Sequence, residues 1–212
     1  MLGTHDLALF VVSGLLLNIS PGPDSLLIMT RSATQGWRAG CTAALGIGAG
    51  TLVHIVAAAL GLSAVLATSS AAFTIVKLVG AAYLVWVGVG MLRSRAGGIA
   101  AQSAAELPAL PYRKIFLQGF LTNVLNPKVA IFFLAFVPQF IAPDAANKPL
   151  AFLLLGLIFN VNGMLWCNGL AVFTALASRK VRLPGTVVTW LNRAIGGVFV
   201  ALGVKLALTR QS

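Results

Sequence analysis

The 212-residue sequence has few charged side chains: only 9% are Asp, Glu, Lys or Arg, and only four residues are acidic. A soluble domain carries about 25% charged residues. With 58% hydrophobic residues and a mean hydropathy of +0.94, this chain cannot present a normal solvated surface. Several apolar stretches approach the about 20 residues that cross a bilayer. The sequence therefore predicts an all-α integral membrane protein, with residues 1–212 as one transmembrane domain and no soluble module.

The scarcity of acids leaves a net charge of +11, which by itself could indicate a nucleic-acid partner. The basic residues, however, fall in short clusters between apolar runs, as the positive-inside rule describes, rather than along one stripe. No nucleic-acid partner is therefore predicted. The first apolar run has no Lys or Arg before Arg31 and no small-residue cleavage pattern after it, so it is expected to be a span and not a signal peptide.

Six apolar segments predict six spans. They are expected at residues 7–28, 39–66, 72–92, 116–141, 150–175 and 187–208. The predicted spans place ten Lys or Arg residues on one side of the membrane and four on the other. The side with ten is predicted to be cytoplasmic, and both termini are predicted on the outer side. The ten are Arg31, Arg38, Arg93, Arg95, Arg113, Lys114, Arg179, Lys180, Arg182 and Arg193, and the four are Lys77, Lys148, Lys205 and Arg210.

The chain also repeats itself around a linker at about residues 96–112. The matches are Gly14 with Gly119 and Asn18 with Asn123 at a shift of 105, and Lys77 with Arg193, Gly80 with Gly196 and Tyr83 with Phe199 at a shift of 116. Repeat one (about 1–95) and repeat two (about 113–212) then contain three spans each. Because three is odd, the second repeat enters the membrane from the opposite face. This is the inverted repeat of many secondary transporters.

Each repeat contains a break in its first span, which is the first or the fourth span of the chain. "NISPGPDSLL" places Pro21, Gly22 and Pro23 within span one, and "NVLNPKVAIFF" places Asn126 before Pro127 within span four. Asparagine is a good helix cap and proline suits the first helical position. Both breaks are therefore expected to begin a half-helix whose N-terminus, with its partial positive charge, faces the interior and suits a carboxylate.

Asp24 and Lys128 are the only acid and base deep within the predicted spans. Each costs about 2.5–3.5 kcal/mol at a helix centre. We expect them to face each other across a cavity, with a substrate ammonium at Asp24 and its carboxylate at Lys128. Asn18, Asn123 and Asn126 are the further candidates for this site. The plainer alternative is that Asp24 only caps its helix while Lys128 snorkels or pairs with it.

Three segments resemble the signature regions of the LysE/RhtB family of amino-acid exporters. They are "SPGPDSLLIMTRSATQGWRAGCTAALGIGAG", "KLVGAAYLVWVGVGMLRS" and "FLTNVLNPKVAIFFLAFVPQF". The positions that match the family's motifs are Pro21, Gly22, Pro23, Asp24, Asn126, Pro127 and Lys128. The resemblance implies proton-driven export of amino acids across the bacterial inner membrane, and "SPGPD" resembles the homoserine/threonine-type branch.

The expected function is thus secondary-active export of small neutral amino acids like homoserine, threonine or leucine, with protons and the lipid bilayer as partners, no cofactor and no enzymatic activity. A homo-oligomer is left open. One alternative is a divalent-cation exporter, although hard cations want several oxygen ligands. Another is a thiol–disulfide carrier using Cys41 and Cys167, although neither cysteine has a charged neighbour to lower its pKa.

Two polar features in other spans have open roles. His54 could relay protons, or it could pack against a backbone carbonyl. Asn160 and Asn162 lie two residues apart on a predicted helix, so at most one of them is expected to line a transport path.

Overall fold

The computed structural model describes residues 2–62, 70–93, 109–177 and 185–208, and every regular element in these ranges is helical. The elements are α1 (Leu7–Ile19), α2 (Pro23–Gln35), α3 (Trp37–Ala57), the π-helix η1 (Ala58–Leu62), α5 (Ser70–Arg93), α6 (Tyr112–Val124), α7 (Pro127–Ile131), the π-helix η2 (Phe132–Phe136), the 3-10 helix η3 (Val137–Phe140), α8 (Lys148–Ala177) and α9 (Gly185–Leu208). The predicted linker and the end of the predicted second span lie largely outside the described residues.

The two predicted helix breaks are present. α1 and α2 meet at an angle of 55°, and α6 meets the segment Pro127–Phe140 at 46°. Pro23 and Pro127 stand in the first turn of α2 and α7, where a residue without an N–H costs no hydrogen bond. Between α1 and α2, Ser20 and Gly22 adopt extended backbone conformations. The bends therefore arise from local proline and glycine chemistry.

Within the described ranges, two continuous helices are long and apolar enough to cross a membrane: Trp37–Gly61 with 25 residues and Lys148–Ala177 with 30. The number rises to four when each bent pair is counted as one span. α5 and α9 are 24 residues long each, above the about 20 residues that a span needs. The helices are thus compatible with a membrane protein, and the arrangement as six spans stays a prediction.

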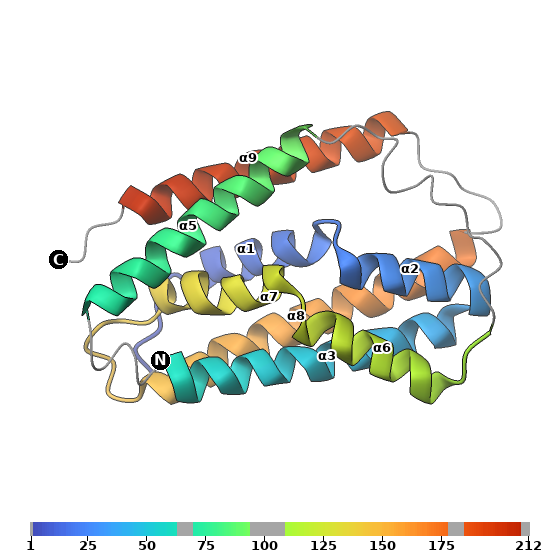
Figure 1. Ribbon diagram of the computed structural model, residues 1–212, viewed down its shortest axis with the longest axis horizontal. Coiled ribbons are helices and arrows are strands. Elements are labelled where there is room, and N and C mark those ends of the chain that lie inside the picture. The colour runs from blue at the N-terminus through green and yellow to red at the C-terminus, as the bar shows by residue number, and fades with distance from the viewer. Residues whose placement is uncertain (1, 63–69, 94–108, 178–184, 209–212) are drawn as a thin grey trace.

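Corresponding helices of the two halves run in opposite directions. In Figure 1, α1 and α2 run one way along the bundle while α6 and α7 run the other way, and the same holds for α3 against α8 and for α5 against α9. α1 covers residues 7–19 and α6 covers residues 112–124, so both bounds are displaced by the 105 residues of the sequence repeat. This order and direction support the predicted inverted repeat.

The helices form two groups. α5 and α9 pack along each other, with Gly88 against the backbone of Gly196, and α5 contacts the remaining helices at η2. α3 lies between α6 and α8 in the larger group. At Gly46 of α3 and Gly119 of α6, an added Cβ would collide with backbone atoms of the facing helix. The small residues of α3 therefore allow close helix packing.

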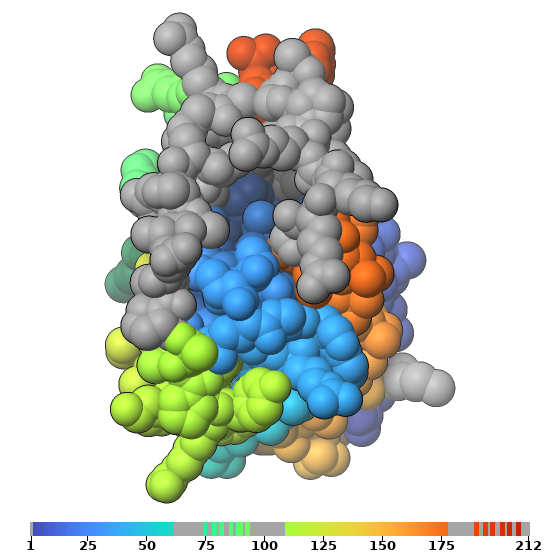
Figure 2. All heavy atoms as spheres, turned by 90° about the vertical axis from the view of Figure 1, so that its right-hand side faces the viewer, coloured from blue at the N-terminus to red at the C-terminus, as the bar shows by residue number. Residues whose placement is uncertain are grey.

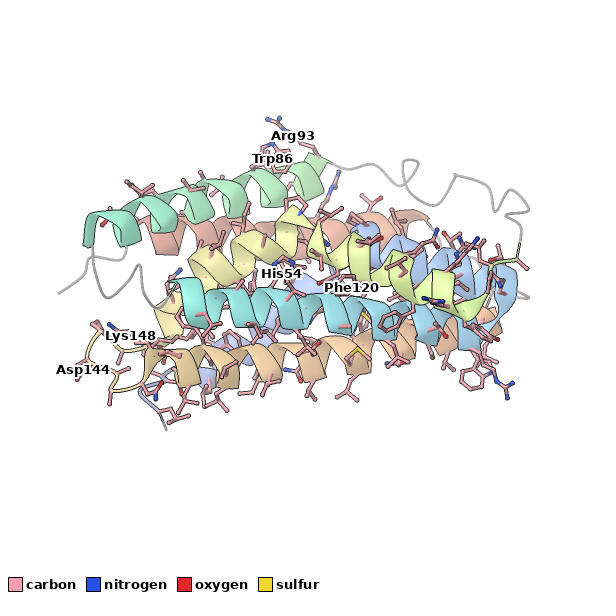
Figure 3. All side chains as sticks on the ribbon, turned by 60° about the horizontal axis from the view of Figure 1, so that its bottom comes forward. His54, Trp86, Arg93, Phe120, Asp144 and Lys148 are labelled. Carbon is pink, nitrogen blue, oxygen red and sulfur yellow. The ribbon has the colours of Figure 1, made fainter. Side chains whose placement is uncertain are left out.

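Different helix ends and different charged residues lie at the two ends of the bundle. α1 begins and α9 ends at the same end (Figure 1). Asp144 and Lys148 lie near this end in Figure 3. Figure 2 looks onto the opposite end, where the end of α2, the start of α6 and the end of α8 lie side by side. Arg31 lies near that end but is only 6% exposed, and it donates to the side-chain oxygens of Gln35 and Gln118.

Candidate substrate site

The helix breaks of the two halves meet at Asp24. One carboxylate oxygen, Oδ2, accepts hydrogen bonds from Asn123 Nδ2 at 2.8 Å and from Asn126 Nδ2 at 3.1 Å. Asp24 lies in the first turn of α2, but the cap residue of α2 is Gly22 and no side chain caps this helix. The alternative that Asp24 only caps its own helix is therefore wrong. Its carboxylate joins the first half of the chain to the second.

Asn123 is almost fully buried at this junction, with 1% exposure. Its Nδ2 donates to Asp24, and its Oδ1 lies 3.2 Å from the hydroxyl of Thr51 on α3. The backbone carbonyl of Asn123 lies 3.0 Å from Nε2 of His54, whose ring stacks on Phe133. His54 points from α3 towards the α6–α7 segment (Figure 3). It thus packs against a carbonyl, which is the plainer of the two roles considered for it.

Lys128 binds the end of α1. Its Nζ donates to the carbonyl oxygens of Leu17 at 3.1 Å and Ser20 at 3.0 Å, and to the hydroxyl of Ser20 at 3.1 Å. A helix end leaves its last carbonyls without intrahelical partners, and a lysine can satisfy them. An ammonium has three protons, and all three have acceptors here. Gly22 leaves room for it, because a Cβ there would lie 3.1 Å from Nζ.

The direct pairing of Asp24 with Lys128, which belonged to the plainer alternative, is not formed. No ion pair joins Asp24 and Lys128 in the described part of the chain, although both side chains line one pocket. The reason is that each has other partners: Asp24 is held by two amides of the second half, and Lys128 is held by the last turn of α1. The two interactions are reciprocal, since each break is completed by a side chain from the other half.

Asn126 begins the second half-helix as the sequence predicted. Its Oδ1 accepts a hydrogen bond from the backbone N–H of Lys128 at 3.0 Å, and Pro127 takes the first helical position. Because Oδ1 caps α7, the amide Nδ2 is left to donate to Asp24. Asn126 is 2% exposed, so this cap is buried in the protein.

A pocket lies beside the two breaks, with about 480 Å³ of empty space when its opening is included. Its polar lining residues are Asn18, Asp24, Ser25, Thr51, Asn123, Lys128 and Asn160, and its larger apolar ones include Leu17, Ile47, Phe159 and Met164. Two buried atoms of this lining have no hydrogen-bond partner: Oδ1 of Asp24 and Nδ2 of Asn18. The pocket thus offers a free acceptor and a free donor.

The asparagines of α8 and the two cysteines differ in whether they line the pocket. Asn160 lines the pocket and Asn162 does not, in agreement with the expectation that at most one of them would. Asn168 donates to the carbonyl of Met164 within α8. Cys167 lines the pocket, and it and Cys41 are both free thiols.

Sequence reasoning missed Ser20, Thr51, Gly48, Gly163 and Met164 as residues of the site. One signal was present for Thr51. It lies three residues before His54 and four after Ile47, so all three share a face of α3. The glycines carried no signal beyond close packing, because which helix they face depends on the tertiary arrangement.

Comparison with known proteins identifies the family of the chain. The family model of LysE type translocators matches residues 15–210. The homoserine/homoserine lactone efflux protein of Salmonella typhi is 31% identical over 203 residues, which are 96% of each chain. An uncharacterized membrane protein of Pseudomonas aeruginosa is 33% identical over 213 residues, covering 100% of this chain and 99% of the relative. No solved structure matches. The chain therefore belongs to the LysE type translocator family, whose members act in transport, and it is a membrane protein of the amino-acid exporter type.

Proposed function

We propose that this protein is a secondary-active exporter of small neutral amino acids, such as homoserine or threonine, and that it couples export to protons in the bacterial inner membrane. One observation carries the proposal. Asp24 is a membrane-embedded carboxylate with one oxygen fixed by the second half of the chain, and its other oxygen is buried without a partner in a pocket. An ammonium group or a proton would supply that partner.

The surroundings of Asp24 suit the rest of an amino acid. The first N–H groups of α2 have no intrahelical partner and carry a partial positive charge, which favours a carboxylate. Phe159 and Met164 add apolar surface to the pocket lining, which suits the side chain of a neutral amino acid. When no substrate is bound, Asp24 takes the proton that drives the exchange.

The comparisons support this choice of substrate class. Two relatives from Salmonella that are 31% identical to this chain are named homoserine/homoserine lactone efflux proteins. A divalent cation is a poorer fit, because Asp24 is the one carboxylate among the residues that line the pocket, and hard cations want several oxygen ligands.

A growth-inhibition panel tests the proposed function. We expect overexpression, in cells without their own exporters, to protect against inhibitory homoserine, threonine or their toxic analogues, because export lowers the internal concentration. Basic and acidic amino acids should show no protection. Protection against divalent cations alone would instead identify a cation exporter.

The orientation of the chain in the membrane gives a second test. A reporter fused at Ala100, which lies outside the described residues, is expected on the cytoplasmic side, and a reporter at the C-terminus is expected on the outer side. The reason is the excess of bases near the end of the bundle where α2 ends and α6 begins. A cytoplasmic C-terminus would contradict either the six spans or the count of bases.

A further inference from the structure

We propose that Asn160 of α8 determines which side chains the pocket prefers. Its amide binds a side-chain hydroxyl of the substrate, so hydroxylated amino acids bind better than aliphatic ones of the same shape. This inference rests on the proposed function. It goes beyond it by assigning a residue that discriminates among small neutral amino acids. Asp24 cannot do so, because all of them carry the same ammonium.

Asn160 lies on the face of α8 that borders the pocket. The lining residues from this helix are Phe159, Asn160, Gly163, Met164 and Cys167. Steps of three and four residues from Asn160 to Gly163, Met164 and Cys167 place these residues on one face of the helix. Asn160 is the one residue of this set with an amide side chain. It is therefore a polar point in a largely apolar wall.

The amide of Asn160 is available to a ligand. The residue is half-buried, and its side chain makes no hydrogen bond within the part of the chain that the structure describes. Neither polar atom of this amide is completely buried, in contrast to Nδ2 of Asn18. An amide offers both a donor and an acceptor, and so does a hydroxyl. A substrate hydroxyl therefore matches Asn160 whichever way its amide is turned.

The helix that faces Asn160 leaves space beside its amide. At Gly48 of α3, an added Cβ would lie 3.5 Å from Oδ1 of Asn160 and 2.5 Å from Sδ of Met164. Because Gly48 has no side chain, α3 does not cover this side of the amide. Methionine side chains adapt to irregular shapes. The space between α3 and α8 is thus bordered by one amide and one adaptable apolar group, which suits a short side chain that ends in a hydroxyl.

Other polar groups of the lining are already bonded or lie elsewhere. The hydroxyl of Thr51 bonds within the protein, and the three protons of Lys128 have acceptors at the end of α1. Ser25 follows Asp24 directly in the first turn of α2, so it lies where the substrate ammonium is expected. Asn160 is left to bind a hydroxyl between α3 and α8.

The apolar surroundings make the effect of Asn160 measurable. Without a polar partner, an apolar wall favours a methyl group over a hydroxyl, because the hydroxyl loses its hydrogen bonds to water. One hydrogen bond to an amide changes an affinity by about two- to tenfold. The presence or absence of the Asn160 amide should therefore decide which of two ligands of equal shape binds more tightly.

The test is equilibrium binding of L-homoserine and L-norvaline to the purified full-length protein in detergent. The two amino acids have the same shape and differ in a terminal hydroxyl against a methyl group. We expect the wild-type protein to bind homoserine at least about threefold more tightly than norvaline. Asn160→Leu and Asn160→Ala both remove the amide but differ in volume. Both variants should bind norvaline more tightly than homoserine.

Two control variants separate recognition by Asn160 from a general disturbance of the pocket or of α8. Asn162→Leu removes an asparagine of α8 that does not line the pocket. Ser25→Ala removes the hydroxyl next to Asp24. Both should keep the wild-type preference for homoserine. Because the result is a ratio of two affinities in one protein, a variant preparation with less folded protein gives the same ratio.

Three outcomes would overturn the inference and leave the proposed function intact, since both ligands still bind. They are equal affinities for the two ligands in the wild-type protein, an unchanged preference in both Asn160 variants, and a preference that is lost in Ser25→Ala instead. If the wild-type protein binds neither amino acid, the proposed function fails and the inference fails with it.

Discussion

Asp24→Asn is expected to abolish amino-acid export while the protein still folds. Asparagine keeps one oxygen that can accept from Asn123 and Asn126, so the junction between the two halves survives. The other carboxylate oxygen, which is buried without a partner, becomes an NH₂ group, which cannot bind an ammonium or a proton. Hydrogen bonds to charged groups contribute about 1.5–3 kcal/mol, so export should fall by at least about tenfold to a hundredfold from binding alone.

The measurement is resistance to a toxic analogue at matched levels of inserted protein. Asp144→Asn is the matched control, because this exposed acid lies in the loop before α8, near one end of the bundle in Figure 3, and does not line the pocket. It should export normally. Normal export by Asp24→Asn would end the proposed role of Asp24 and leave the family assignment unaffected.

Lys128→Met is expected to lower both stability and export. Methionine has a similar length but no donor, so the carbonyl of Ser20 loses the lysine at the end of α1, and the carbonyl of Leu17 keeps only the hydroxyl of Ser20. A buried acceptor without a partner costs about 1–3 kcal/mol, so we expect the free energy of unfolding to fall by about that amount. Thermal unfolding of the purified protein measures this change.

Lys148→Met is the control for Lys128, since this lysine lies in the first turn of α8 at the end of the bundle. It should unfold at the wild-type temperature. If Lys128→Met keeps its full stability and loses only substrates with a free carboxylate, Lys128 is a substrate ligand and not a cap of α1.

The broken helices were predictable because proline and asparagine favour the first positions of a helix through local interactions. Pro23 and Pro127 begin half-helices because proline has no N–H to donate and its ring excludes a preceding helical turn. Asn126 caps its helix for an equally local reason. The predicted repeat rests on similar residues at equivalent positions near the ends of α1 and α6.

The partners of the charged residues could not be predicted from the sequence. Asp24 and Lys128 have opposite charges and neighbouring positions in the repeat, which favoured positions on two sides of one cavity. In the structure each one completes the break of the other half. That outcome depends on how α1, α2 and α6 pack around α3, which no local pattern specifies.

Burial is a second property that the sequence did not show. Arg31 counted as one of the bases on the cytoplasmic side, but its side chain is buried against two glutamines. A count of bases gives the side of the membrane and not the depth of the side chain. The position of Gly163 next to Asn18 could not be predicted either, because it follows from the packing of α8 against α1.

Transport by wild-type and Asp24→Asn protein in proteoliposomes tests most directly whether export runs through the Asp24 pocket and is coupled to protons. Labelled homoserine would be loaded inside, and its loss would be followed with and without an imposed pH gradient. We expect the gradient to accelerate homoserine efflux through the wild-type protein, and the Asp24→Asn variant to show neither gradient-driven efflux nor exchange at equal pH. Gradient-driven efflux at the wild-type rate through Asp24→Asn would contradict the account.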